Sequence, residues 1–154
     1  MSVMDDAVAR AHDFARRAHA GQKYGDQDYY AAHLAAVAAR LAAYGPELEI
    51  AGVLHDVLED TEVTASDLRT EGFPERSIAA IIAVTRVPGE RYADLIARAA
   101  SHLDSALVKY ADNRSNWDDL ATVSDADSRD RLAEKYEAAA VVLERALVRL
   151  ADPR

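Results

Sequence analysis

Apolar residues recur at intervals of three and four along most of the chain, the spacing that places side chains on one face of an α-helix. Alanine is abundant, and the 6 glycines and 4 prolines are few for 154 residues. Long helices are therefore favoured over strands. The pattern predicts helices over approximately residues 3–20, 30–44, 46–59, 64–70, 74–86, 92–100, 104–120 and 124–150.

Turn and capping residues support these boundaries. Gly45-Pro46 ends the second predicted helix, Thr64 begins a cap-plus-acid arrangement, and Pro74 suits a first helical turn. Residues 21–29 are polar and contain glycine, so they are expected to form a loop. Four side chains of the helix over 74–86 are each expected to be largely buried: Ile78, Ile81, Ile82 and Val84.

The whole chain has the size and composition of one globular domain. Half of its residues (50%) are hydrophobic, and no internal repeat or linker divides it. We therefore expect a single all-α domain over residues 1–154. No apolar run is long enough to span a bilayer, no signal peptide precedes the first helix, and there is no cysteine. These features favour a cytoplasmic protein without membrane attachment.

The formal net charge is -9, which argues against a nucleic-acid partner because an acidic surface repels the phosphate backbone. A small phosphorylated substrate is still compatible with this charge. A cation and a few local Lys or Arg side chains can reverse the field inside one cleft. Whether the chain forms a homo-oligomer is left open by the sequence.

One segment carries the candidate chemistry. Residues 53–61 would suit a buried helix except for His55, Asp56 and the acidic pair Glu59-Asp60. Burying several ionisable groups together costs free energy unless a cation and water satisfy them. The segment therefore predicts a metal site.

His33 and Asp112 lie on two other predicted helices and complete a set of two imidazoles and two carboxylates with His55 and Asp56. Side chains from separate helices of a bundle can converge on one ion. Adjacent residues point about 100° apart around a helix, so a helix end or distortion is needed at residues 55–56. Mixed nitrogen and oxygen ligands suit Mn²⁺, Fe²⁺ or Zn²⁺ better than Mg²⁺.

Polar residues near these ligands suggest further roles. Glu59 and Asp60 each lie one helical turn beyond a ligand, where one of them could orient or deprotonate a water molecule. Asn116 lies one turn beyond Asp112 and could hold a substrate hydroxyl or phosphate oxygen. Lys109 precedes Asp112 by three residues and is a candidate countercharge.

Each of these residues also has a purely structural interpretation. A histidine on an apolar face is usually a hydrogen-bonded core residue, and the acidic pair fits a helix end that meets solvent. Asp112 could simply pair with Lys109 or Arg114. Burying the whole set without a cation would be far more costly than burying any one member. The remaining histidines are assigned no ligand role: His12, His19 and His102.

These motifs resemble the hydrolase domain of the RelA/SpoT alarmone enzymes and the small single-domain alarmone hydrolases of the metazoan SpoT-homologue type. The resemblance covers roughly residues 5–120 and is densest over residues 54–64 with Asp67-Leu68. Further matching segments are residues 19–22, residues 30–33, and residues 107–112 with Asn116.

The resemblance implies an HD-domain helical bundle in which the four ligand candidates bind Mn²⁺. It also implies that Glu59 and Asp60 activate water and that Asn116 contacts the substrate ribose or phosphate. The family reaction removes pyrophosphate from the 3′ position of (p)ppGpp and leaves GDP or GTP. A phosphorylated nucleotide is thus the implied partner.

The chain departs from the family in the loop before the first ligand. That loop usually carries an Arg-Lys pair and a Gly-x-Pro-Tyr run, where this chain has Tyr24-Gly25 and residues 27–30. The family's Arg helps to pack the guanine base, so Tyr24 is expected to stack a base here. Adjacent Lys23 is expected to supply the charge.

A second departure follows Thr85-Arg86, where the connection is shorter than in the family. Tyr92 and Arg98, together with Arg91, are the candidates for the missing phosphate contacts. The favoured function is a Mn²⁺-dependent (p)ppGpp 3′-pyrophosphohydrolase. The alternatives are an HD-type hydrolase of another nucleotide or phosphorylated metabolite, and a non-catalytic nucleotide-binding module.

Overall fold

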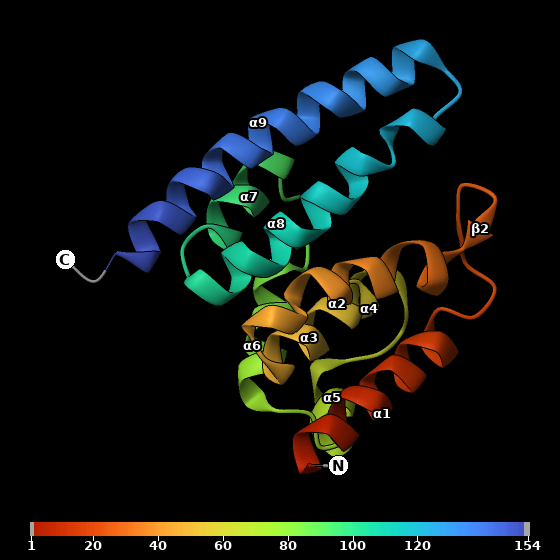
Figure 1. Ribbon diagram of the computed structural model, residues 1–154, viewed down its shortest axis with the longest axis vertical. Helices are drawn as coiled ribbons and strands as arrows, with labels where there is room; N and C mark the ends of the chain where they lie inside the picture. Colours follow the sequence, from red (N-terminus) through yellow and green to blue (C-terminus); the bar gives the residue numbers. More distant parts are fainter. Residues whose placement is uncertain (1, 153–154) are drawn as a thin grey trace.

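The computed structural model describes residues 2–152 and is built almost entirely from helices (Figure 1). The α-helices of these residues are α1 (Val3–Ala18), α2 (Ala35–Leu41), α3 (Pro46–Val53), α4 (Val57–Asp60), α5 (Ala65–Thr70), α6 (Glu75–Val84), α7 (Tyr92–Ala99), α8 (Leu103–Asp118) and α9 (Ala126–Ala151). The shorter elements are the π-helix η1 (Tyr30–Leu34), the 3₁₀ helices η2 (Ala42–Tyr44) and η3 (Leu120–Thr122), and the strands β1 (Lys23–Tyr24) and β2 (Gln27–Asp28). The prediction of an all-α fold is confirmed.

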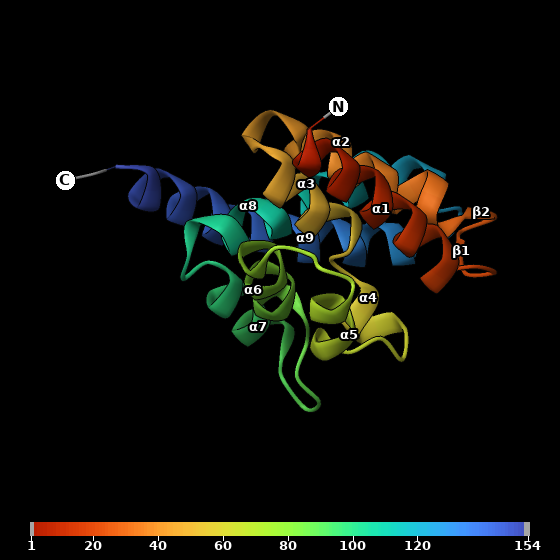
Figure 2. The ribbon, with the colours of Figure 1, turned by 90° about the horizontal axis from the view of Figure 1, so that it is seen from below.

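Helix α3 is the centre of the bundle, because it packs against α1, α2, α6 and α8. Its contact with α2 is close at Gly52, where an added Cβ would lie 2.6 Å from Leu41 Cδ1 and 3.3 Å from Ala38 Cα. Figure 1 shows α8 and α9 lying side by side above α2 and α3. In Figure 2, α6 and α7 lie on the opposite side of α8 from α1 and α2. A smaller apolar cluster joins α7 to α9 through Ile96 and Leu143.

The segment between α1 and η1 is more ordered than the predicted loop. It forms an antiparallel hairpin in which Lys23 pairs with Asp28 and Tyr24 pairs with Gln27. Gly25 turns the chain with φ 61°, a conformation that glycine adopts readily. The hairpin stands at one end of the bundle (Figures 1 and 2).

Two details of the predicted helices are wrong. The helix expected over residues 46–59 ends at Val53 and resumes as α4, because the backbone bends at Leu54 (φ -102°, ψ 5°). Ile82 is 43% exposed, since it lies on the outer face of α6 while Ile78 and Ile81 point inward. The capping box predicted at Thr64 is confirmed, with Thr64 and Asp67 each bonding to the other's backbone N–H.

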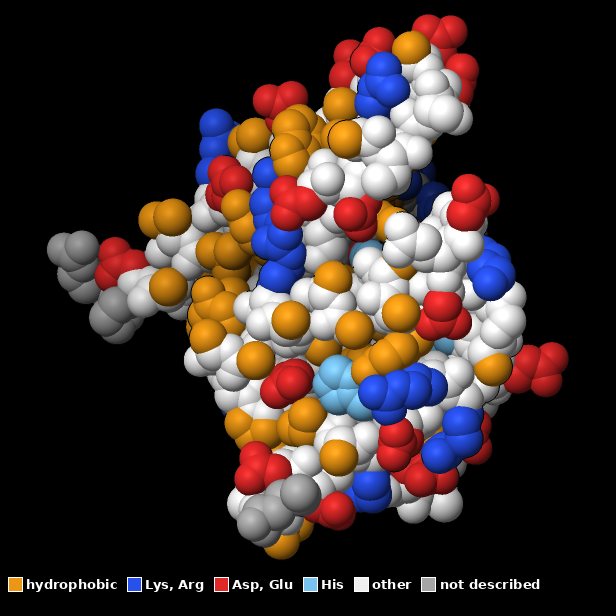
Figure 3. Space-filling view, turned by 45° about the vertical axis from the view of Figure 1, so that its right-hand side comes forward, with side chains coloured by type: hydrophobic (Ala, Val, Ile, Leu, Met, Phe, Trp, Pro, Cys, Tyr) orange, Lys and Arg blue, Asp and Glu red, His pale blue; other side chains and the backbone are white. Residues whose placement is uncertain are grey.

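Among residues 2–152, no helix combines the length and the apolar character needed to cross a bilayer. The face drawn in Figure 3 carries interspersed acidic and basic side chains rather than one continuous basic patch.

Candidate metal centre

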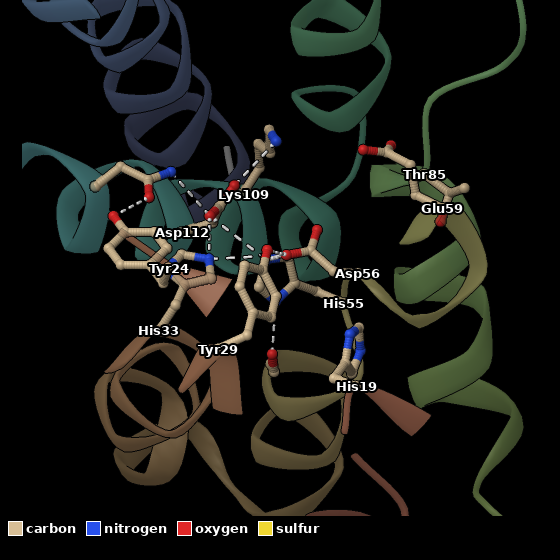
Figure 4. Close-up of polar contacts among 12 residues, drawn as sticks. His19, Tyr24, Tyr29, His33, His55, Asp56, Glu59, Thr85, Lys109 and Asp112 are labelled. Atoms are coloured by element: carbon tan, nitrogen blue, oxygen red, sulfur yellow. Dashed lines mark hydrogen bonds and ion pairs between the residues drawn. The ribbon is translucent and has the colours of Figure 1, made fainter. Parts of the chain in front are cut away.

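Three separate segments bring the four ligand candidates together (Figure 4). His33 lies on the π-helix η1, His55 and Asp56 lie in the bend between α3 and α4, and Asp112 lies on α8. Single π-turns are frequent at functional sites because they redirect a side chain within a helix. The bend at residues 54–56 similarly allows two adjacent side chains to face one point.

The distances between these groups suit one shared cation. Asp112 Oδ1 lies 3.0 Å from His33 Nε2 and 3.4 Å from His55 Nε2. Asp56 Oδ2 lies 3.1 Å from His55 Nε2 and 3.8 Å from His33 Nε2. One ligand atom each from His33, His55 and Asp112 lies within 4.8 Å of the others, and all three residues are buried. The structure therefore brings all four predicted ligands to one place.

The ring of His55 is held so that one nitrogen faces the carboxylates. Its Nδ1 lies 2.7 Å from the Gly52 carbonyl oxygen, which can only accept, so Nδ1 carries a proton and Nε2 is the nitrogen that faces the carboxylates. In the described chain, His55 Nε2 is buried without a hydrogen-bond partner, and so is Nδ1 of His33. A divalent cation would satisfy Nε2 of His55 and the facing carboxylates, so these residues fit a metal ion.

Neighbouring charges lower the pKa values of Asp56 and Asp112 by more than burial raises them. Although burial alone would raise it, the pKa of Asp56 is lowered to about 2, mainly by His55 and then by a hydrogen bond from Tyr29. Burial also opposes ionisation of Asp112, yet Lys109 and His55 hold its pKa well below the usual value. Both carboxyls are therefore ionised and available as ligands at neutral pH.

Neighbouring side chains hold the carboxylates in place. The Lys109 ammonium donates to Asp112 Oδ2 over 3.0 Å, and the Asn116 amide donates to Asp112 Oδ1 over 3.1 Å. The hydroxyl of Tyr29 donates to Asp56 Oδ2 over 2.5 Å. Burial, followed by Asp56, raises the pKa of Tyr29, so this phenol keeps the proton that it donates.

The centre opens into a polar cavity of about 190 Å³. Both members of the acidic pair line this cavity from α4, and Glu59 accepts a hydrogen bond of 2.8 Å from the Arg86 backbone N–H. Desolvation, followed by Asp56 and Glu59, raises the pKa of Asp60 to about 6. A carboxylate with this pKa can accept a proton from water at neutral pH.

Four of the predicted substrate-binding residues line this cavity, namely Tyr24, Tyr92, Lys109 and Asn116. Two others do not. Lys23 is an exposed residue of β1 and is absent from the lining. Arg98 also lies outside the lining, because its guanidinium bonds to the carboxylate of Glu90 and to the carbonyl oxygens of Ile82, Ala83 and Thr85.

Tyr24 does not stand free in the cavity. Its ring is stacked on the His33 imidazole, with centroids 5.0 Å apart and planes 5° apart, and its hydroxyl donates to Asn116 Oδ1 over 2.8 Å. Figure 4 shows the two rings lying one over the other. The face of Tyr24 that meets His33 is therefore occupied.

The sequence did not indicate three further polar residues of the cavity, Tyr29, Arg86 and Lys135. Tyr29 lies in the segment predicted as a loop, and Lys135 lies on α9, beyond the motifs. Arg86 lies in the connection between α6 and α7. The one available signal was the position of Tyr29 close before a ligand.

A wider and shallower hollow adjoins the polar cavity. It has a volume of about 740 Å³ and is lined by the turn over residues 86–91 together with Leu58 and Glu59. Glu59 and Arg86 belong to both spaces. Figure 2 shows the chain between α6 and α7 projecting from the bundle at this place.

Curated proteins with similar sequences act on guanosine nucleotides. The chain is 33% identical over 121 residues to the guanosine-3′,5′-bis(diphosphate) 3′-pyrophosphohydrolase of Aquifex aeolicus, covering 72% of this chain and 17% of the relative. It is 44% identical over 66 residues to the GTP pyrophosphokinase of Streptomyces coelicolor, covering 42% and 8% respectively. The chain thus spans less than a fifth of the length of either relative.

A solved structure covers nearly the whole chain, and a family model covers more than half of it. The structure, described as "A metazoan ortholog of SpoT hydrolyzes ppGpp and plays a role in starvation responses", has a TM-score of 0.74 and 22% identity, covering 97% of this chain and 94% of that one. At this identity the likeness supports the fold. The family model described as HD domain matches residues 11–114, more than half of the 154 residues, and the chain therefore belongs to the HD-domain family.

Proposed function

We propose that this protein is a metal-dependent phosphohydrolase and that its reaction is the removal of pyrophosphate from the 3′ position of (p)ppGpp. The observation that carries this proposal is the convergence of His33, His55, Asp56 and Asp112 beside a cavity that also holds Glu59 and Asp60. The Aquifex relative, by its name, performs this reaction.

We propose Mn²⁺ as the resident cation, held by the two imidazoles and the two carboxylates. Mixed nitrogen and oxygen ligation favours Mn²⁺, Fe²⁺ or Zn²⁺ over Mg²⁺. When bound, the ion would supply Lewis-acid catalysis at a phosphoryl group. A divalent charge also offsets the two ionised carboxylates that the site buries.

The side chains of α4 would handle the proton of the attacking water. Asp60, with a pKa of about 6, is ionised at neutral pH and can take that proton. Glu59 is held by the Arg86 backbone N–H and would orient the same water. Attack of water on the 3′-linked phosphorus forms a P–O bond, breaks the bond to the ribose oxygen, and releases pyrophosphate.

Two cations support a substrate with more than one phosphate group. Arg86 and Lys135 line the cavity, and within residues 2–152 neither has a carboxylate at ion-pair distance. Desolvation, followed by Lys109 and Arg86, lowers the pKa of Lys135. A phosphate group bound between these side chains would relieve this repulsion.

The chain departs from the family at the position expected to contact the guanine base. Tyr24 stands where the family has an arginine for the guanine base, and its ring already stacks on His33. This observation favours the alternative of a hydrolase for another nucleotide or phosphorylated metabolite. Release of pyrophosphate from ppGpp, compared with release of orthophosphate from a panel of nucleotides, distinguishes the two. Absence of ppGpp turnover with Mn²⁺ would remove the first choice.

A non-catalytic nucleotide-binding module is the second alternative, and two variants test it. We expect His55→Ala to lose both metal and activity, and Glu59→Ala to keep the metal and lose activity. His102→Ala is the matched control, because His102 is exposed and precedes α8 at the end remote from Asp112. Activity that persists in both site variants would contradict the proposal. The expected cytoplasmic location stays a prediction, and oligomerisation is left open.

A further inference from the structure

Two tyrosines of the hairpin segment reach the metal centre from one side. Tyr24 ends β1 and Tyr29 follows β2, and their ring centroids lie 6.1 Å apart. We propose that Tyr24 and Tyr29 are positioning residues that hold the carboxylates of the centre in ligand geometry. This inference rests on the metal site proposed above, and it assigns the hairpin a role in metal binding rather than in base stacking.

Tyr29 acts on Asp56 directly. Its hydroxyl donates to Asp56 Oδ2 over 2.5 Å, and this same oxygen lies 3.1 Å from His55 Nε2. The hydrogen bond therefore fixes the oxygen that faces the other ligands. Without the donor, the carboxylate would be free to rotate about its Cβ–Cγ bond. Hydrogen bonds of this kind to ligating carboxylates raise metal affinity by orienting the ligand.

Tyr24 acts on Asp112 through Asn116. The Tyr24 hydroxyl donates to Asn116 Oδ1 over 2.8 Å, and Asn116 Nδ2 donates to Asp112 Oδ1 over 3.1 Å. Because a hydroxyl that donates must meet the amide oxygen, it turns the amide nitrogen towards Asp112. The oxygen so held is the one that lies 3.0 Å from His33 Nε2.

The rings of both tyrosines also enclose His33. The Tyr24 ring lies flat on the imidazole at 5.0 Å, and the Tyr29 ring meets it at 5.5 Å with planes 51° apart. The imidazole is thereby restricted in rotation from two sides. The hairpin and the residue that follows it thus constrain three of the four candidate ligands, and Figure 4 shows Tyr24 and Tyr29 beside them.

Ordinary core packing does not account for these contacts. Both tyrosines are half-buried and line the polar cavity. Both hydroxyls are directed at polar groups of the centre. Tyr30, the next residue in the chain, instead directs its hydroxyl to His12 Nδ1 at 2.6 Å, away from the centre. Tyr30 therefore provides a matched control for the same chemical change.

The test is the affinity of metal-free protein for Mn²⁺, measured by titration calorimetry or by the electron paramagnetic resonance signal of free Mn²⁺. We expect Tyr29→Phe to bind Mn²⁺ about 10–100-fold more weakly than the wild type, the usual effect of removing such a hydrogen bond. Tyr24→Phe, which keeps the ring stack, is expected to weaken binding about 10-fold. Tyr30→Phe is expected to bind as the wild type does.

Thermal unfolding of the metal-free variants separates positioning from general stability, because a purely structural role would lower stability and leave the affinity unchanged. Wild-type affinity in both Tyr29→Phe and Tyr24→Phe would overturn the inference and leave the metal site standing. If the wild type itself binds no Mn²⁺, the proposed function fails instead. If Tyr29→Phe does not fold, the Mn²⁺ affinity of Tyr24→Phe alone tests the inference, and wild-type affinity in that variant would overturn it.

Discussion

Asp60 is the carboxyl whose protonation is most open to measurement. Its pKa is raised from 3.8 to about 6, first by desolvation and then by Asp56 and Glu59. A general base works only in its ionised form, so activity is lost as the pH falls through this value. Asp60 therefore ties the proposed reaction to a defined acidic limit.

We expect kcat with Mn²⁺ to decrease about tenfold per pH unit at or below pH 6, because the fraction of ionised Asp60 decreases in that proportion and bound Mn²⁺ offsets the Asp56 charge that helps to raise this pKa. The measurement is a pH–rate profile of the wild type beside Asp60→Asn. The asparagine variant should be slower at pH 8 and should lose the limb near pH 6. Persistence of that limb in Asp60→Asn would assign it to another group.

Lys135 offers a separate test of the anionic substrate. We expect Lys135→Met to raise KM for ppGpp by about 10–100-fold, since a hydrogen bond to a charged group contributes about 1.5–3 kcal/mol. The control is Arg145→Met, because Arg145 is an exposed residue of the same helix and lines neither the polar cavity nor the adjoining hollow. Equal KM values in the two variants would remove Lys135 from the substrate site.

At this scale the candidate ligands and their neighbours along the sequence were predictable, whereas cavity residues contributed by distant elements were not. His33, His55, Asp56 and Asp112 stand out because polar residues interrupt apolar helices. Lys135, by contrast, is one of several charged residues on the exposed side of a long helix, and only the packing of α9 on α8 turns it towards the cavity.

The bend between α3 and α4 is the element that makes the centre possible. Residues 54–56 contain neither glycine nor proline, so local propensity favours an unbroken helix through them. The bend coincides with the contact of His55 Nδ1 to the Gly52 carbonyl oxygen, which lies within the last turn of α3. The ligand geometry predicted a helix end or distortion near residues 55–56, but not which residue α3 would end at or how the backbone would bend.

The turn after α6 is a second element on which the site depends. Arg98 Nη1 donates to the carbonyl oxygens of Ile82 and Ala83, Nη2 donates to that of Thr85, and the guanidinium also pairs with Glu90. These bonds satisfy carbonyl groups that the helix end leaves free. The same turn carries the Arg86 N–H that bonds to Glu59.

We expect Arg98→Met to lower the free energy of unfolding by about 2–3 kcal/mol and to reduce kcat, because several charge-assisted bonds are lost and Glu59 loses its fixed partner. Denaturant unfolding and steady-state kinetics provide the two measurements. The control is Arg69→Met, which breaks only the exposed pair with Glu75 at 2.8 Å. Similar stability losses in the two variants would contradict this role of Arg98.

In the whole molecule, the ligands join segments that are far apart in the chain. His33 belongs to η1, His55 and Asp56 to the bend after α3, and Asp112 to α8. A cation bound to all of them exists only in the folded state, so its binding free energy adds to stability. The bundle and its metal are therefore expected to be thermodynamically linked.

We expect Mn²⁺ at 100 times its Kd to stabilise the metal-free protein by about 2.7 kcal/mol, or about 5–10 °C in Tm. Differential scanning calorimetry before and after treatment with a chelator provides the measurement. The shift should vanish in His55→Ala and persist in His102→Ala. An equal shift in both variants would indicate metal binding elsewhere.

The fold class and the number of main helices followed from periodicity, because alanine-rich amphipathic segments separated by few glycines and prolines leave little choice of architecture. What did not follow was the hairpin. The paired segments of β1 and β2 are two residues each and too short to show strand alternation, and their order depends on contacts of Tyr24 and Tyr29 with distant residues.

The unequal sizes of the polar cavity and the adjoining hollow, which meet at Glu59, affect the substrate specificity of the protein. The compartment beside the ligands measures about 190 Å³ and is ringed by charged side chains, whereas the neighbouring hollow measures about 740 Å³ and is bordered largely by one surface turn. A small charged cavity beside a large open hollow selects substrates by the charge of their phosphate groups more than by the shape of their base. Exchanging guanine for adenine should therefore slow turnover less than removing one phosphate group.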